Sequence, residues 1–440
     1  MKRSILTAIG LAVVVPLALA SCSNGGGTAS STESATASGP VTLSLAGWSL
    51  KTTPEFQKLA DAFHAANPNI TVDVKEYDAT NYDTQMTADL AAGSAPDIYV
   101  QKNLKNFITY QSGNQLLDVS DVAAKVGNEV SGLADYKVDG KTYAIPYRQD
   151  SWYLYYNKDL FSAANVKTPD GSWTWDDYAT AAENLTSGLK AAGNPALGTY
   201  QHTWQSTVQG LALAQTPKAD LLSGNFSYLK PYYERALKLQ KDGAQVNYGT
   251  VTTNNLNYGA QFGTQKSAMM IMGSWYVATL IAQQTNGDAN TFNWGIAPAP
   301  QYDSSTAGTG KTPVTFGDPT GLGINPAINK SKVAAAKEFL AFVASEDGAK
   351  GLADIGITPA HVSDAATAAY FNFKGMPTDN LSKFTFSTHN TKPENPVSKH
   401  TAGLQNILAD LHSSVMSGSA SIDDAIKTAE GRAKNEVLNQ

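Results

Sequence analysis

The stretch that decides the fold is VTLSLAGWSLKTTPEFQKLADAFHAANPNITVDVKEY, residues 41–77. Apolar and polar residues alternate over residues 41–45 and again over residues 70–74, which is the two-residue period of a strand. Between these segments, apolar residues recur at helical spacing from Phe56 to Phe63. A strand, a helix and a second strand in this order predict a right-handed βαβ unit with parallel strands, and therefore an α/β fold.

The predicted helix carries its own start and stop signals. Thr53 is a suitable N-cap, Pro54 suits the first helical position, and Glu55 favours the positive end of the helix dipole. Asn67 followed by Pro68 predicts the end of the helix.

The rest of the chain continues the mixture of helices and strands. We expect helices at residues 82–92, 174–185 and 330–343, and strands at residues 95–101, 266–273 and 321–324.

The ends of the first strands are the expected ligand site. In open α/β sheets, ligands bind at the carboxyl ends of the strands. Trp48 follows the first strand, and Gln101 and Asn103 lie at the end of the strand 95–101. We therefore predict that these three residues contact a ligand, with core packing as the alternative for Trp48.

Length and charge limit the class of protein. A chain of 440 residues favours two domains over one core. It has 32 basic and 38 acidic side chains, and this acidic balance argues against a nucleic-acid partner and against a polybasic membrane patch. The 7 tryptophans and 20 tyrosines supply ample flat aromatic surface.

The N-terminal segment predicts a lipid anchor. Lys2 and Arg3 precede an uncharged apolar run over residues 5–20, which is typical of a signal-peptide core. The single cysteine of the chain, Cys22, ends a Leu-Ala-Ser-Cys stretch that resembles the lipobox of bacterial lipoproteins. We therefore expect a lipoprotein signal peptide at residues 1–21 and lipid on Cys22, with an ordinary signal peptide and an incidental cysteine as the alternative. Residues 22–40, rich in Gly, Ser and Thr, predict a flexible linker that tethers the protein to the extracellular face of the cell membrane.

Sequence motifs give little support to an enzyme. The chain has no H-E-x-x-H, G-x-S-x-G or G-x-G-x-x-G motif. Residues 305–312 approach a phosphate loop, but Ser305 replaces the first glycine and Pro313 follows where a helix should begin. We expect neither a cofactor nor a metal. A glycosidase that uses two carboxylates stays open, because acidic residues are plentiful.

The stretch DGKTYAIPYRQDSWYLYYNKDLF, residues 139–161, resembles the family-one extracellular solute-binding proteins of ABC importers, which include maltose- and multiple-sugar-binding proteins. The family pattern Gly-Lys-x-Tyr-x-x-Pro-Tyr occurs at residues 140–147, and Tyr-Asn-Lys-Asp-Leu-Phe occurs at residues 156–161. Further matches follow the family order at residues 95–97, 174–175, 266–275, 321–324 and 356–360.

The resemblance implies a periplasmic-binding-protein-like fold, in which two α/β lobes are joined by crossing hinge segments with the ligand cleft between them. Lobe 1 would comprise residues 41–149 and 318–345, and lobe 2 residues 150–317 and 346–440. The crossings would fall near residues 148–152, 316–320 and 344–346.

The resemblance also extends the list of expected ligand contacts. With Trp48, Gln101 and Asn103 it comprises Asp150, Trp152, Trp204, Ser274, Trp275, Asp318 and His361. For His361 a surface role is the equal alternative. Indole planes suit the apolar face of a sugar ring, and carboxylates accept its hydroxyl hydrogens.

The sequence therefore leaves three functions open. The first is a monomeric, non-enzymatic lipoprotein that captures an oligosaccharide and delivers it, by lobe closure, to the permease of an ABC importer. The second is a binder of another solute on the same fold, such as a peptide, a polyol or a phosphodiester. The third is a surface glycosidase that uses Asp150 and Asp318.

Overall fold

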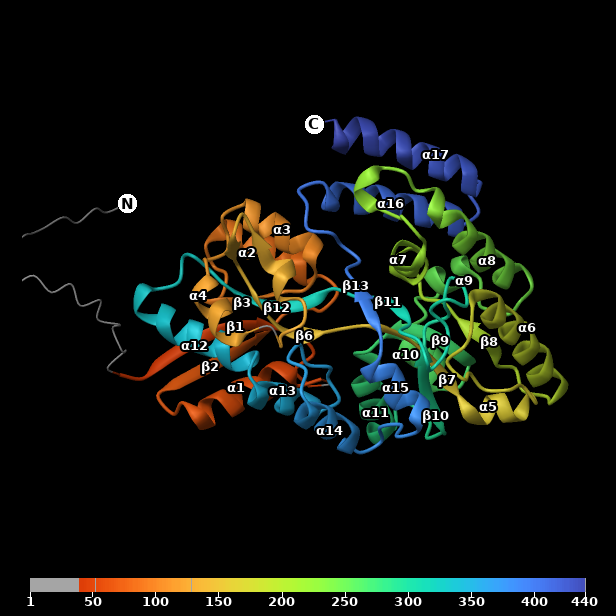
Figure 1. Cartoon of the computed structure of the whole chain (residues 1–440), viewed down its shortest axis with the longest axis horizontal. Coiled ribbons are helices and arrows are strands. Elements are labelled where there is room, and N and C mark those ends of the chain that lie inside the picture. Colours follow the sequence, from red (N-terminus) through yellow and green to blue (C-terminus); the bar gives the residue numbers. More distant parts are fainter. Residues whose placement is uncertain (1–38, 52, 128, 440) are drawn as a thin grey trace, which may run out of the picture. The chain divides into compact units, whose positions relative to one another are not determined.

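The computed structural model describes residues 39–51, 53–127 and 129–439 (Figure 1). The predicted signal peptide, the lipidation of Cys22 and the linker up to residue 38 lie outside these residues and stay predictions. None of the helices in the described ranges is long and apolar enough to cross a membrane.

The first sheet contains the predicted βαβ unit. Strand β1 pairs in parallel with β2, with Val41 opposite Ile70, and with β3 on its other side. Strand β12 runs antiparallel to both of its neighbours, β3 and β6. The order is β2-β1-β3-β12-β6, with bounds β1 (Val41–Gly47), β2 (Ile70–Glu76), β3 (Ile98–Gln101), β6 (Ile145–Gln149) and β12 (Pro319–Ile324).

The helices around this sheet supply most of the first apolar core. They are α1 (Glu55–Ala66), α2 (Tyr82–Ala92), α3 (Leu104–Ser112), α4 (Ser120–Val126), α12 (Val333–Val343) and α13 (Glu346–Ala353) (Figure 1). Helix α2 ends, as predicted, at Gly93, which takes the left-handed conformation with φ of 71°. The start of α1 differs from the prediction: Pro54 occupies the N-cap position, no side chain caps the helix, and Glu55 is buried. Glu55 turns inward because a cation inside the molecule binds it, as described below.

The second sheet has the order β10-β7-β9-β8, with bounds β7 (Trp152–Asn157), β8 (Leu197–Tyr200), β9 (Ser267–Gly273) and β10 (Trp294–Pro298). All seven residues of β9 are buried, as its apolar composition predicts. The surrounding helices are α5 (Lys158–Ala163), α6 (Trp175–Ala191), α7 (Ser206–Gln215), α8 (Lys230–Lys241), α9 (Tyr248–Thr253), α10 (Tyr258–Gly263), α11 (Tyr276–Asn286), α14 (Asp364–Asn372), α15 (Asn380–Ser387), α16 (Thr401–Met416) and α17 (Ile422–Arg432) (Figure 1). Thr174 caps α6 in a full capping box, at the start of the helix expected from residue 174.

Two short ribbons complete the strands. Strands β4 (Lys137–Val138) and β5 (Lys141–Thr142) form a hairpin. Strand β11 (Val314–Phe316) pairs in parallel with β13 (Asn390–Lys392) beside the second sheet.

The chain passes between the two sheets at short connections. Residues 150–151 join β6 to β7, and residues 317–318 join β11 to β12. Leu352, Ile357 and Ala360 pack in the first core, whereas Ala353 and Tyr370 pack in the second, so the segment that follows the expected crossing near 344–346 contacts both cores. Ser345 instead caps α13, accepting a hydrogen bond from the Gly348 amide. The exact division into lobes therefore stays a prediction.

Candidate functional site

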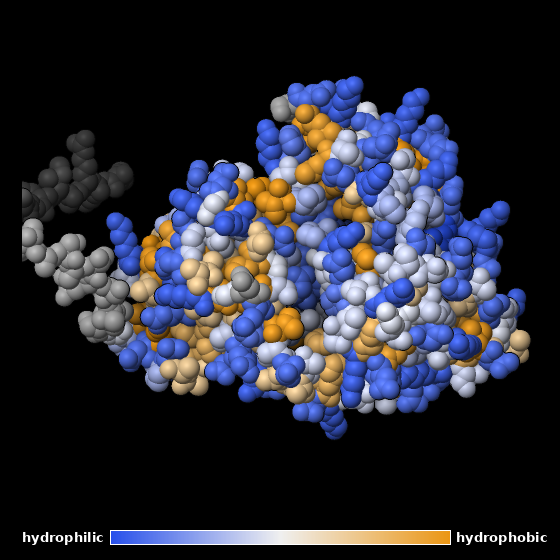
Figure 2. Space-filling model, in the orientation of Figure 1, coloured by the Kyte–Doolittle hydropathy of each residue, from blue (hydrophilic) through white to orange (hydrophobic). Residues whose placement is uncertain are grey.

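A cleft of about 820 Å³ lies between side chains that come from both sheets. On the first-sheet side, its walls are the segments that follow β1 and β3 together with the end of β6. On the second-sheet side, they are the start of β7 and the residues that follow β8 and β9. The volume falls in the range of small-molecule sites. In the space-filling view, a hollow separates the parts built on the two sheets on this face, and the outer surface is mainly hydrophilic (Figure 2).

The structure brings most of the predicted contact residues together in this cleft. Those that line it are Trp48, Asn103, Asp150, Trp152, Trp204, Trp275 and Asp318. They come from sequence positions far apart, so the fold assembles them into one site.

Three predicted contact residues do not line the cleft. Gln101 is fully buried, and neither atom of its side-chain amide has a hydrogen-bond partner. Ser274 is also fully buried, and its hydroxyl donates to Asp150 Oδ1 at 2.7 Å, so it positions that carboxylate from behind. His361 turns toward the first core, where its Nδ1 lies 3.1 Å from the carbonyl oxygen of Ala344.

Three tryptophans form an aromatic wall on the second-sheet side. Trp152 and Trp275 meet edge to face with ring centroids 5.5 Å apart, and Trp204 lies 6.4 Å from Trp275. Trp204 is 41% exposed, which is unusual for a tryptophan in a folded protein. An exposed indole inside a cleft offers a flat apolar face to a ligand.

Trp48 has a different environment from the aromatic wall. Its ring packs edge to face against Phe56 and Tyr82, each with centroids 5.0 Å apart, and it is 8% exposed. The Lys102 ammonium lies 5.3 Å from its ring centroid. Trp48 is therefore a residue of the first core, and one edge of its ring reaches the cleft. The packing is consistent with both roles expected for it, core packing and ligand contact.

A buried chain of charges forms the floor of the cleft. Arg148 Nη1 donates to Glu55 Oε2 at 2.7 Å, and Arg148 Nε lies 2.9 Å from Asp150 Oδ2 in an ion pair without hydrogen-bond alignment. Burial raises the pKa of Glu55, while the positive charge of Arg148 opposes that rise. Because Arg148 and Ser274 engage Asp150, this carboxylate is held rigidly at the first connection.

Asp318, in the connection between β11 and β12, accepts hydrogen bonds from segments that are distant in the sequence. Its Oδ1 accepts from the backbone amides of Glu394 and Asn395, at 2.9 and 3.1 Å. Its Oδ2 accepts from the Leu104 amide at 3.1 Å and from Asn395 Nδ2 at 2.6 Å. Burial raises the pKa of Asp318, and these bonds oppose the rise. With four donors already bound, Asp318 has little acceptor capacity left for a ligand.

The list of expected contact residues did not include several other side chains of the cleft: Glu55, Lys102, Arg148, Tyr258 and Glu394. The strand-end rule that selected Gln101 and Asn103 also covers Lys102, which stands between them. Tyr258 is the first residue of α10 and lies next to a loop, where the sequence carries no signal of burial or direction. Among the described residues, no group of three or more His, Cys, Asp or Glu side chains has the arrangement to hold a metal ion.

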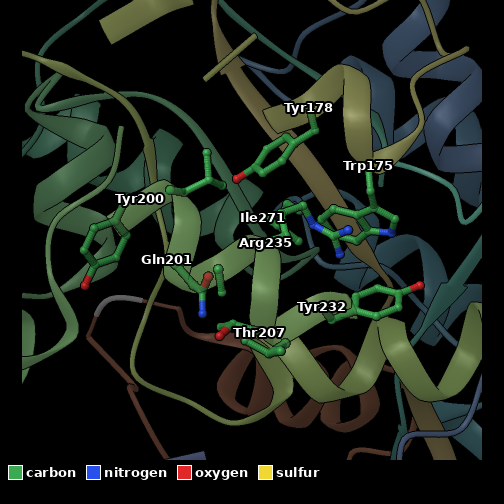
Figure 3. Close-up of a pocket in the computed structure, with 11 residues that line it drawn as sticks. Trp175, Tyr178, Tyr200, Gln201, Thr207, Tyr232, Arg235 and Ile271 are labelled. Carbon is green, nitrogen blue, oxygen red and sulfur yellow. The ribbon is translucent and has the colours of Figure 1, made fainter. Parts of the chain in front are cut away.

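A second, much smaller cavity lies inside the part built on the second sheet, next to Arg235 (Figure 3). The Arg235 guanidinium lies 4.1 Å from the ring centroid of Trp175 and 4.7 Å from that of Tyr232. Burial lowers the pKa of Arg235 to about 10. The cavity measures about 30 Å³, which is room for water but not for a sugar or a peptide.

Comparison with known proteins agrees with this architecture. The family described as bacterial extracellular solute-binding protein matches residues 48–350, more than half of the chain. The crystal structure of a sugar transporter from Rhizobium etli has 30% identity and a TM-score of 0.76, covering 90% of this chain and 99% of that one. The periplasmic-binding-protein-like two-lobed α/β fold expected from the sequence is thereby confirmed.

Two curated relatives match over shorter lengths. A putative binding protein of Brucella abortus is 26% identical over 285 residues, which is 62% of this chain and 66% of the relative. The sn-glycerol-3-phosphate-binding periplasmic protein UgpB of Shigella dysenteriae is 30% identical over 168 residues, 35% of this chain and 36% of the relative. The chain thus spans slightly less than two thirds of the first of these relatives and about a third of the second.

Proposed function

Because the chain belongs to the bacterial extracellular solute-binding proteins, of the maltose and multiple-sugar type, we propose that it captures an oligosaccharide and delivers it to the permease of an ABC importer. The observation that carries this proposal is the aromatic wall of Trp152, Trp204 and Trp275 along a cleft of about 820 Å³. A sugar ring has an apolar C–H face and a polar rim, and stacked indoles bind that face. Trp204 and Trp275 are the more accessible indoles, because Trp152 is 4% exposed and stacks on Phe316. Two accessible indoles side by side favour two or more sugar units.

Delivery depends on a coupling between binding and closure. A ligand that contacts both walls stabilises the arrangement in which the walls are close, and so shifts the population toward it. The short connections at residues 150–151 and 317–318 are the proposed hinges, with Asp150 and Asp318 anchored at them. The permease would recognise the closed arrangement. The proposed anchor at Cys22 would keep the protein, a monomer, at the outer face of the membrane.

A binder of a phosphodiester or a polyol is the second candidate, supported by the glycerol-phosphate-binding relative. An anionic ligand needs free cations in the cleft. Arg148 is already paired with two carboxylates, whereas the Lys102 ammonium donates one hydrogen to the Ala79 carbonyl oxygen and keeps its charge. Four carboxyl groups also line the cleft, those of Glu55, Asp150, Asp318 and Glu394, and they repel an anion. The charges of the cleft therefore favour a neutral ligand.

A glycosidase function has less support than solute binding. Catalysis by two carboxylates needs one acid and one base or nucleophile that face the scissile bond. Asp150 is held by Arg148 and Ser274, and Asp318 accepts four hydrogen bonds from protein donors. Neither carboxylate has the freedom that this chemistry requires.

The test is a ligand screen followed by calorimetry on two matched variants. Thermal-shift measurements would compare oligosaccharides, polyols, glycerol phosphodiesters and short peptides, because a bound ligand raises Tm by mass action. With the oligosaccharide that binds best, Trp275→Ala should weaken affinity at least tenfold, about 1.4 kcal/mol. Tyr302→Ala is the control, because Tyr302 is 46% exposed and does not line the cleft. Stabilisation by another solute class alone, or unchanged affinity of Trp275→Ala, would contradict the proposal.

A further inference from the structure

His202 is a cleft residue that the aromatic wall leaves unexplained. It follows β8, lines the cleft and is half-buried. Its ring meets Trp204 edge to face with centroids 4.6 Å apart, and Tyr258 with centroids 5.3 Å apart. The imidazole therefore stands beside the most exposed indole of the wall.

The hydrogen bonds of Tyr200 determine which ring nitrogen of His202 carries the proton. Tyr200 Oη lies 2.9 Å from the Leu256 carbonyl oxygen and 3.0 Å from His202 Nδ1. A carbonyl oxygen only accepts, so the single hydroxyl proton goes to Leu256. The second bond then forms only if Nδ1–H donates to the Tyr200 oxygen. In Figure 3 the Tyr200 ring turns away from Arg235, which leaves its hydroxyl to these two partners.

This assignment leaves the other nitrogen as an acceptor. In a neutral imidazole with hydrogen on Nδ1, Nε2 carries a lone pair and no proton. Burial lowers the pKa of His202 to about 4, so the ring is neutral at pH 7. Nε2 of His202 has no hydrogen-bond partner among the described residues.

His412 shows the opposite arrangement in the same molecule. Its Nε2 lies 3.0 Å from the Thr203 carbonyl oxygen, so Nε2 must carry the hydrogen. Its Nδ1 lies 3.0 Å from Tyr233 Oη and accepts that hydroxyl proton. Burial lowers the pKa of His412 to about 4 as well. The two histidines therefore share charge state and differ in tautomer, which makes His412 an internal control.

We infer that His202 determines specificity at one subsite: its Nε2 accepts a hydrogen bond from a hydroxyl of the bound ligand, next to the ring that stacks on Trp204. This inference rests on the proposed function and adds a requirement to it. A neutral acceptor without a proton binds a hydroxyl donor and rejects a group that only accepts, such as a carboxylate, a phosphate or an O-methyl ether. Asp318 does not replace it, since this carboxylate has its acceptor sites filled.

Nuclear magnetic resonance of the full chain tests the tautomer without a variant. Two-bond ¹H–¹⁵N spectra of protein labelled with ¹⁵N-histidine, recorded at pH 7, should show hydrogen on Nδ1 of His202 and on Nε2 of His412. Saturation with the best oligosaccharide should move the His202 Nε2 resonance upfield, as for a nitrogen that accepts a hydrogen bond, and leave His412 unchanged. A charged His202, or hydrogen on its Nε2, would overturn the inference.

Calorimetry on two variants tests the specificity. His202→Phe keeps a flat ring without the acceptor and should weaken oligosaccharide affinity at least tenfold. His202→Gln offers a carbonyl oxygen and should stay within about threefold of the wild type, which corresponds to about 0.7 kcal/mol. If the wild-type protein binds an oligosaccharide and His202→Phe binds it equally well, the inference fails while the proposed function stands. If the wild-type protein binds no oligosaccharide, the proposed function fails and the subsite fails with it.

Discussion

Replacing Arg148 with methionine removes the cation from between two buried carboxylates at the floor of the cleft. Arg148 lies 2.7 Å from Glu55 and 2.9 Å from Asp150, and methionine keeps much of its aliphatic volume. Removing one partner of a buried ion pair costs about 3–5 kcal/mol, because the remaining charge is left uncompensated. Each carboxylate keeps one neutral donor, Tyr147 Oη at 3.3 Å and Ser274 Oγ at 2.7 Å. We therefore expect a loss near the lower end, about 3 kcal/mol of unfolding free energy at pH 7.5.

The loss should depend on pH in a defined direction. Burial raises the pKa of Glu55, and Arg148 opposes the rise, so the variant should raise this pKa further. A group whose pKa is higher in the folded state stabilises the fold most below its unfolded value and loses that contribution as pH rises. The difference between Arg148→Met and wild type should therefore be smaller at pH 4.5 than at pH 7.5.

Urea denaturation followed by tryptophan fluorescence measures both quantities, with the m-value as a check that the folded state is unchanged. Arg432→Met is the matched control, because Arg432 also pairs with two carboxylates, Asp410 at 2.8 Å and Glu436 at 2.9 Å, but at the surface. Exposed pairs contribute about 0–1 kcal/mol. Equal losses in the two variants, or a loss in Arg148→Met that does not change with pH, would refute the reasoning.

The remaining predictions concern separate sites. Burial and the nearby Asp318 raise the pKa of Glu394 to about 7, so its stabilising contribution is present below about pH 4.5 and lost as pH rises through 7. The unfolding free energy of Glu394→Gln relative to wild type should therefore rise by up to about 3 kcal/mol between pH 4.5 and pH 8. Equal effects of the substitution in urea denaturation at the two pH values would contradict this. Gln101→Met should raise the unfolding free energy by about 1 kcal/mol, because it removes a buried amide without partners, and should leave ligand affinity unchanged in calorimetry. A fall in affinity would instead restore Gln101 as a ligand contact. Asp318→Asn should lower the unfolding free energy by about 2–3 kcal/mol in urea denaturation, because an amide presents hydrogens toward donors that need an acceptor. A variant as stable as the wild type would contradict the stabilising role of Asp318 at residues 317–318. Cys22→Ser should release the protein from the membrane fraction into the medium, as followed by immunoblot after fractionation, and protein that stays in the membrane fraction would argue against the lipid anchor.

The sequence by itself determined the features that depend on neighbours in the chain. The two-residue period of β1 and β2 and the helical spacing of α1 predicted a parallel βαβ unit, and the structure pairs Val41 with Ile70 in that way. The helices expected at residues 174–185 and 82–92 correspond to α6, which Thr174 caps, and to α2, which ends at Gly93. Local periodicity is sufficient here, because burying an apolar face requires the same spacing in every α/β fold.

The strand-end rule found the right edge of the first sheet and two side chains that line the cleft, Trp48 and Asn103, but it was wrong about Gln101. Gln101 and Lys102 are consecutive at the end of β3, and of the two it is Lys102 that lines the cleft. Successive side chains of a strand point to opposite faces, so an error of one residue moves the prediction from the cleft into the core. The sequence alone did not establish on which residue the alternation ends.

Tertiary structure alone decided the roles of the charged and polar groups in the cleft. Glu55 reads in the sequence as a favourable residue at a helix start, yet it pairs with Arg148, 93 positions away along the chain. Asp318 reads as a free acceptor, yet amides from two distant segments occupy its oxygens. The hydrogen on His202 Nδ1 follows from the Tyr200 hydroxyl beside it, whose own proton goes to the Leu256 carbonyl, and these contacts form only in the folded chain. Hydrogen bonds and ion pairs act over a few ångströms in space, and the sequence records a residue's chemistry without recording which partners lie within that distance.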